Sequence, residues 1–300
     1  MLSCIYRILA NGPDVMFNIA DLDTEDDTIE IIASQFFDKK VSVHSIQKGP
    51  VPKVVFERVI DDRCGSAFGG ILADLGSTDN GVSTSTRQVI DSGSTVETLN
   101  PGNSFTHVLV TSHECNYVED NGPGTINGNT RTYAVDGGSL FSYRIPDGKG
   151  AWKTEAWVRT TVATGFRVES KIWNVINPGA PGFVYTFHAK KDDANTGKRP
   201  MIAVAGDCAE SAYIFRPEVL DTDDQDVVAD PQAQYKLMTE IKCGATVGSI
   251  GVGYEDLCSE EQESGYAKLY VPCYEKDKIL VFAMGSGEGA HDYEYDDDGW

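Results

Sequence analysis

Three neighbouring residues of the sequence combine the side chains of covalent catalysis. His113, Glu114 and Cys115 supply an imidazole, a carboxylate and a thiol, which can serve as acid, base and nucleophile where they converge. If this segment ends a strand, however, His113 and Cys115 share one face and Glu114 takes the other, because side chains alternate along a strand. A catalytic role for His113 therefore needs a partner from elsewhere in the chain.

A second polar stretch, RPMIAVAGDCAESAYIF at residues 199–215, places Asp207 between two apolar segments. It could be a catalytic turn, or it could be the polar tip of a β-hairpin. His113 could form a metal site with Asp207 or His188 from other parts of the chain, although no spacing rule supports this combination. His113 and His188 are accordingly the candidate catalytic residues.

The segment DLDTEDDTIE has acidic side chains at nearly alternating positions. A hard cation such as calcium takes oxygen ligands from such a loop, whereas a solvated β-turn is the alternative interpretation. Calcium is the one cofactor that the sequence suggests. The candidate ligands are Asp21, Asp23, Glu25, Asp27 and Glu30.

Three tryptophans cluster in the middle of the sequence, and exposed aromatic rings stack on sugars. Trp157 occupies the place of Phe56 in a repeated strand pattern, which predicts a packing role. Trp173 precedes a loop rich in Pro and Gly and is the best candidate for a ring that faces a carbohydrate.

The elements that must hold these residues are β-strands. Short β-rich segments recur between clusters of Gly, Pro, Asn and Asp, whereas helical periodicity is scarce. The order of apolar strand, polar tip and apolar strand occurs four times, and two more strand candidates precede each such hairpin. We predict four modules of four strands, at about residues 4–46, 53–146, 152–217 and 235–283, with an acidic C-terminal tail at residues 284–300.

The first strand of every module has a similar pattern. The four segments read CIYRILA, VVFERVI, AWVRTTV and YKLMTEI, at residues 4–10, 54–60, 156–162 and 235–241. Repeated antiparallel units of four strands are typical of β-propellers, in which each blade packs against its neighbours. The prediction is therefore an all-β protein with the β-propeller fold.

Several landmarks resemble the FG-GAP and VCBS propeller repeats. They are Phe68-Gly69 followed by Ala73-Asp74-Leu75, and the Ile19 to Asp23 segment before the acidic loop. The resemblance implies either a closed ring of four blades or part of a larger ring, for example one of seven. In such repeats the outermost strand precedes the inner three, so the two ends of this chain could pair. The family binds calcium in D-x-D-x-D-G-x-x-D loops, and the acidic loop departs from that motif at three positions.

Composition excludes several classes of partner. The net charge of −21 repels nucleic acid and anionic membranes, and no run of about 18 apolar residues could span a bilayer. The start of the chain is a poor signal peptide, so we expect a soluble protein, and the family resemblance suggests secretion if an upstream segment is missing. Seven cysteines without a CxxC pair argue against a thiolate zinc site and leave their pairing open.

These features together predict a non-enzymatic binding or interaction module. We expect it to be lectin-like and calcium-assisted, with a carbohydrate or protein ligand. The candidate ligand-binding residues are Trp173, His113 and Asp207. The alternative is a carbohydrate-active lyase or dehydratase that uses His113 or His188 as acid or base together with a metal.

Overall fold

The computed structural model describes residues 16–23, 27–76, 105–113, 137–168, 179–218, 230–254 and 265–285. These residues form antiparallel β-sheets, which confirms the prediction of an all-β protein. Within these ranges three sheets have four strands and the last has three, and consecutive strands pair in every sheet. None of the helices in these ranges has the length and apolar character needed to cross a membrane.

The strands follow the chain from sheet to sheet. The first sheet contains β1 (Met16–Ala20), β2 (Thr28–Gln35), β3 (Lys40–Gln47) and β4 (Lys53–Asp61). The second contains β5 (Ser66–Ala73), β6 (His107–His113), β7 (Gly138–Arg144) and β8 (Val158–Phe166). The third contains β9 (Val184–Phe187), β10 (Met201–Ala205), β11 (Ser211–Pro217) and β12 (Tyr235–Lys242), and the fourth contains β13 (Gly251–Gly253), β14 (Lys268–Cys273) and β15 (Lys278–Ala283). The short helices are α1 (Ala151–Thr154), η1 (Lys191–Asn195), η2 (Pro231–Ala233) and η3 (Tyr274–Lys276).

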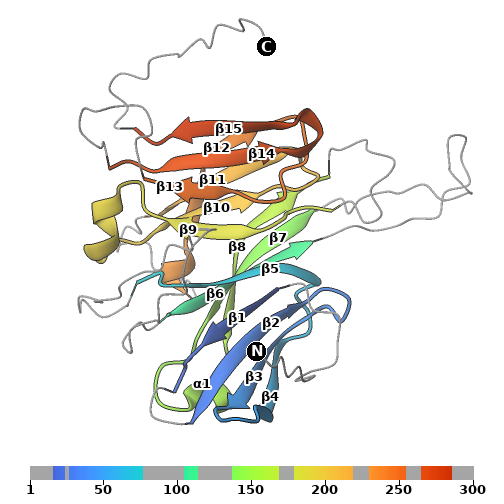
Figure 1. Ribbon diagram of the computed structural model, residues 1–300, viewed down its shortest axis with the longest axis vertical. Coiled ribbons are helices and arrows are strands. Elements are labelled where there is room, and N and C mark those ends of the chain that lie inside the picture. Colours follow the sequence, from blue (N-terminus) through green and yellow to red (C-terminus); the bar gives the residue numbers. More distant parts are fainter. Residues whose placement is uncertain are drawn as a thin grey trace, which may run out of the picture.

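The sheets stack face to face in chain order, with the first and the fourth at the two ends of the long axis (Figure 1). Buried side chains form a separate apolar core between each pair of successive sheets. Each core takes side chains from both of its sheets: Ile32 and Tyr143 lie in the first core, Leu140 and Ile202 in the second, and Ile214 and Leu269 in the third. Among the described residues no core joins the first sheet to the fourth, so this part of the chain is an open stack.

The sheets are offset by one strand from the modules seen in the sequence. β4, β8 and β12 coincide with the segments expected to begin a module, but each pairs with the strand before it, namely β3, β7 or β11. The connections do not decide this pairing, because residues 48–52 precede β4 and residues 62–65 follow it, and the link before β12 is longer than the link after it. Each of these segments is nevertheless the fourth strand of the preceding sheet.

Two glycines let β5 lie close to neighbouring strands on both of its faces. A Cβ atom on Gly70 would lie 2.5 Å from the Ser34 hydroxyl of β2, and one on Gly69 would lie 3.1 Å from the Cα of Phe183. The Gly70 carbonyl also accepts a hydrogen bond of 2.8 Å from the Asn18 amide of β1. The absence of side chains at these two positions therefore sets how closely the first three sheets approach.

Substitution of Gly70 tests this close approach. Gly70→Ala should lower the free energy of unfolding by about 1–3 kcal/mol, the usual cost of overpacking, as measured by urea denaturation. Gly248→Ala is the matched control, because a Cβ atom there would meet nothing within 4 Å. Adding Ser34→Ala removes the colliding hydroxyl and should recover part of the loss. Equal stability of Gly70→Ala and the wild type would contradict the proposed packing.

Candidate functional site

The hairpins that join the second and third strands of the sheets share one backbone feature. The residue directly before the third strand has a positive φ in each sheet: 53° at Lys39, 69° at Gly137, 54° at Glu210 and 49° at Asp277. Asp207, in the third hairpin, has a further positive φ of 51°. Aspartate tolerates this left-handed conformation better than most residues. Among the hairpin residues that the structure describes, Asp207 is thus an additional position with a left-handed conformation.

Asp207 lies beside His113, although the two residues belong to different sheets. His113 Nε2 is 3.9 Å from Asp207 Oδ2, and His113 Nδ1 is 2.9 Å from the carbonyl oxygen of Pro181. Because a carbonyl oxygen only accepts hydrogen bonds, Nδ1 carries the proton and a neutral ring turns its unprotonated Nε2 toward Asp207. Gly179 lies against the imidazole, and a Cβ atom there would be 1.9 Å from the ring.

The surroundings of Asp207 raise the pKa of its carboxyl group. Burial raises the pKa of Asp207 to about 6, a weak hydrogen bond from Cys208 opposes this, and the charge of Glu275 raises the pKa further. Thr246 holds Glu275 in place by donating hydrogen bonds of 2.6 Å from its backbone and 2.5 Å from its hydroxyl. The Asp207 side chain is 19% exposed, against 2% for His113, so a ligand would reach the carboxyl group first.

Two phenylalanines contact His113, and two more extend from them. Phe68 stacks on the imidazole with 4.6 Å between ring centroids, and Phe36 meets the imidazole edge-on at 5.7 Å. Phe183 contacts Phe68 at 5.0 Å, and Phe37 contacts Phe36 at 5.1 Å while 64% of its surface remains exposed. We call these four rings the phenylalanine cluster. It extends from the first hairpin across the second sheet to the start of the third.

A second histidine–carboxylate pair has the opposite character. His107 Nε2 is 2.8 Å from Asp230 Oδ2, and both side chains are completely buried. Burial by itself would raise the pKa of Asp230, but the hydrogen bond and charge of His107 and the backbone N–H of Gln232 outweigh it and lower the pKa. A short and completely buried pair of this kind holds elements together, whereas the His113–Asp207 pair is longer and its carboxyl group is partly exposed.

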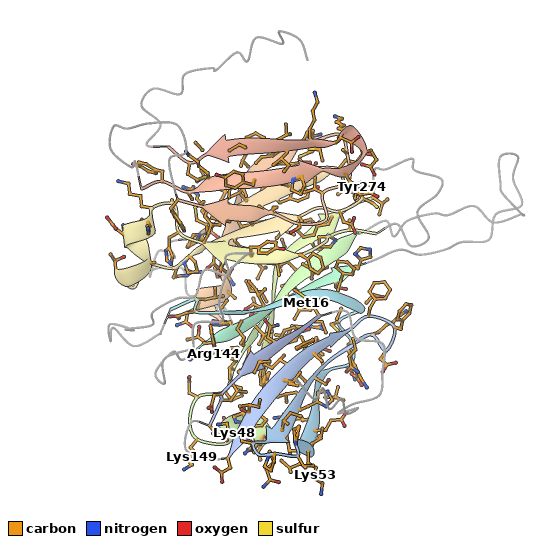
Figure 2. The ribbon with its side chains drawn as sticks, viewed as in Figure 1. Met16, Lys48, Lys53, Arg144, Lys149 and Tyr274 are labelled. Carbon is orange, nitrogen blue, oxygen red and sulfur yellow. The ribbon has the colours of Figure 1, made fainter. Side chains whose placement is uncertain are left out.

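The acidic loop lies at the other end of the sheets. Figure 2 shows Lys48 and Arg144 toward one side of the stack and Met16 and Tyr274, which mark the hairpin end, toward the other. Asp21, the first residue of this loop, forms an ion pair of 3.1 Å with Lys48. The Asp27 side chain is exposed, and Glu25 lies outside the described residues.

Asp23 and Glu30, the two buried carboxylates of the loop, accept hydrogen bonds from the protein. Asp23 accepts from the Gly150 N–H at 2.8 Å and the Trp152 indole at 3.0 Å, and Lys153 lies 3.1 Å away. Glu30 is completely buried. It accepts from the Leu22 N–H and from the hydroxyls of Thr28 and Ser45. These contacts tie the loop to α1 and to β3, and calcium binding stays a prediction.

The remaining candidates lie away from His113 or outside the described residues. Phe183 directly precedes β9 and His188 directly follows it, so His188 lies at the opposite end of this strand. The His188 backbone N–H donates to the Tyr254 hydroxyl at 3.1 Å, and this hydroxyl donates to the His188 carbonyl at 2.9 Å. Trp173 is outside the described ranges. Within those ranges no three His, Cys, Asp or Glu side chains gather as a metal site would require.

Sequence reasoning missed the phenylalanine cluster and Gly179. The adjacent pair Phe36-Phe37 at a predicted hairpin tip was the available signal, because a tip in solvent usually carries polar residues. Nothing in the sequence shows that Gly179 must leave room for the His113 ring.

The raised pKa of Asp207 predicts how stability depends on pH. Between the pKa of Asp207 in the unfolded chain and its folded value of about 6, the carboxyl group stays protonated only in the folded protein. Stability should therefore fall as the pH rises from about 4 to about 6. The fall attributable to Asp207 is at most about 3 kcal/mol, at about 1.4 kcal/mol per pKa unit. Asp207→Asn should remove this dependence in urea denaturation series. Asp147→Asn, at a carboxylate that is 81% exposed, should leave it intact. Parallel curves for Asp207→Asn and the wild type would refute the shift.

Comparison with known proteins adds no family assignment. A scan of protein-family models finds no match to this chain, and a search of curated protein sequences finds no significant match either. The resemblance to FG-GAP and VCBS repeats therefore stays a prediction. The functional argument depends on the geometry at the hairpin end.

Proposed function

We propose that this chain is a non-enzymatic binding module on a β-propeller scaffold, and that it binds a carbohydrate at the hairpin end of its first three sheets. The observation that carries the proposal is the convergence of Asp207, His113 and the phenylalanine cluster at one place. Four-stranded meanders that pack face to face in chain order support the propeller part of the proposal, because blades pack in this way.

The chemistry of the site suits a neutral, hydroxyl-rich ligand. Sugar rings stack their C–H faces on aromatic rings, which the exposed Phe37 offers, and their hydroxyls pair with carboxyl groups such as that of Asp207. The net charge of −21 disfavours anionic ligands. Calcium is not required by this proposal, because Asp23 and Glu30 already accept hydrogen bonds from the protein.

Binding to a glycan array followed by calorimetry tests the proposal. Asp207→Asn should weaken binding of the captured sugar about tenfold or more, since it replaces a hydrogen bond to a charged group. Phe37→Ala should weaken binding about threefold to tenfold through the loss of one stacking ring. Phe17→Ala is the control, because its ring is 58% exposed on β1. The neighbouring Asn18 bonds Gly70 of the second sheet, so Phe17 lies on the opposite face of β1. Capture that none of these variants alters would place the binding site elsewhere.

A second function, a carbohydrate-active lyase or dehydratase, is favoured by one observation. A carboxyl group with a pKa of about 6 lies 3.9 Å from Nε2 of an imidazole whose Nδ1 bonds the Pro181 carbonyl. Groups with such pKa values can exchange protons near neutral pH. In an elimination, one group would remove the C–H proton while the other protonates the leaving oxygen.

The enzyme alternative predicts turnover of the sugar that the array identifies. Formation of an unsaturated or dehydrated product should depend on pH with an apparent pKa near that of Asp207, about 6, and both Asp207→Asn and His113→Gln should reduce the rate at least a hundredfold. Mass spectrometry of the sugar after incubation provides the measurement. Binding without any change in the mass of the sugar would support the binding module and exclude this alternative for that sugar.

A further inference from the structure

Among the described residues no strand pairs with the outer edge of the fourth sheet, and this edge is separate from the ligand site. In the first three sheets the third strand pairs on one side with the second strand and on the other with a fourth strand, β4, β8 or β12. β15 is the third strand of its sheet, and within the described residues it pairs with β14 alone. Its equivalents β3, β7 and β11 are therefore central strands, whereas β15 is an edge strand.

The sequence of β15 is that of a central strand. Ile279, Leu280, Val281 and Phe282 form an uninterrupted apolar run, and Ile279 and Val281 are 65% and 55% exposed. Natural edge strands are protected from further pairing by charged side chains. β12 ends its sheet with charged residues at Lys236, Glu240 and Lys242, while β15 has only Lys278 at its start.

The backbone groups that point out from this edge can be identified. Met284 N–H donates to the Ala267 carbonyl at 2.8 Å, which makes these two residues a hydrogen-bonded pair of the ladder. Since such pairs recur at every second residue of an antiparallel ladder, Phe282 and Leu280 also bond to β14. The N–H and C=O groups of Ile279 and Val281 therefore point to the open edge.

The sequence contains one more segment with the pattern of the strands that fill this position. CIYRILA, residues 4–10, has the pattern of the segments that become β4, β8 and β12, and each of those adds to the third strand of a sheet. Residues 4–10 lie outside the described residues. The link from Ala10 to Met16 spans at most about 20 Å when fully extended. Three successive sheet spacings amount to about 30 Å, and the first and fourth sheets lie at opposite ends of the stack (Figure 1).

We propose that residues 4–10 of a second copy of this chain add to the edge of β15 as the fourth strand of the last sheet. Two copies that exchange this segment reciprocally would form a closed dimer. Backbone hydrogen bonds from Ile279 and Val281 would hold the added strand, as in other cases of β-strand addition. The apolar run of β15 would then occupy a central position like that of β3, β7 and β11.

Two proline variants and their mixture test the proposal on the full chain. Val281→Pro removes an N–H group from the open edge without removing a bond to β14, and Ile8→Pro interrupts the added strand. Each variant alone should be monomeric by light scattering at micromolar concentrations at which the wild type is dimeric. An equimolar mixture should regain a dimer, because the intact edge of one variant can take the intact strand of the other. Val281→Thr, which keeps the N–H group, should remain dimeric.

Other outcomes would overturn the proposal. A monomeric wild type would show that the edge is open or is filled within one chain, and a dimer that persists in both proline variants would place the interface elsewhere. Failure of the mixture to associate would show that the edge and the strand do not meet between copies. Circular dichroism of each variant confirms that the loss of association is not a loss of folding.

Discussion

The second sheet lies between two neighbours and must bury both of its faces, and this requirement shapes the rest of the structure. β6 is buried at every position, with Val108 and Val110 in the core toward the first sheet and Leu109 in the core toward the third. A strand buried on both faces reads as a continuous apolar run and loses the alternation of a half-exposed strand. Gly69 and Gly70 on the adjacent β5 then set the distance to both neighbours.

The same requirement explains where exposed apolar side chains remain. The end sheets each have a packed neighbour on one side only among the described residues, and they carry most of the exposed large apolar side chains. Phe17 and Ile19 lie on β1 of the first sheet, and Ile279 and Val281 lie on β15 of the fourth. Further contacts in the assembled protein would reduce the cost of leaving these side chains in water.

Most of the fold could be predicted from the sequence, because strands and turns leave local signals. The apolar segments around the tips at Asp38, Asp207 and Lys276 all became paired strands, and the internal repeat gave their order. The sheet boundaries could not be predicted, because a strand such as Lys53–Asp61 carries no signal for which neighbour it will join. The connections before and after it, residues 48–52 and 62–65, are nearly equal in length, so the choice depends on the cores that form when the sheets pack.

The candidate site could be predicted only as separate residues. His113 and Asp207 were both identified by their chemistry, but their proximity depends on how the second and third sheets pack, and no local pattern encodes that distance. His107 shows the reverse case: the sequence around it is unremarkable, yet the fold buries it against Asp230.

The two histidine–carboxylate pairs show why residue type does not decide function in this protein. The His107–Asp230 contact is 2.8 Å long and fully buried, so each group is satisfied by the other and neither can meet a ligand. At His113 the partner nitrogen is fixed by the Pro181 carbonyl, the carboxyl is 3.9 Å away, and burial without a close partner raises the pKa of Asp207. At this distance the carboxyl group and the imidazole do not share a hydrogen bond. A ligand hydroxyl between them would bond both groups. The burial that raises the pKa of Asp207 would also strengthen such a hydrogen bond, because less water competes for the carboxyl group.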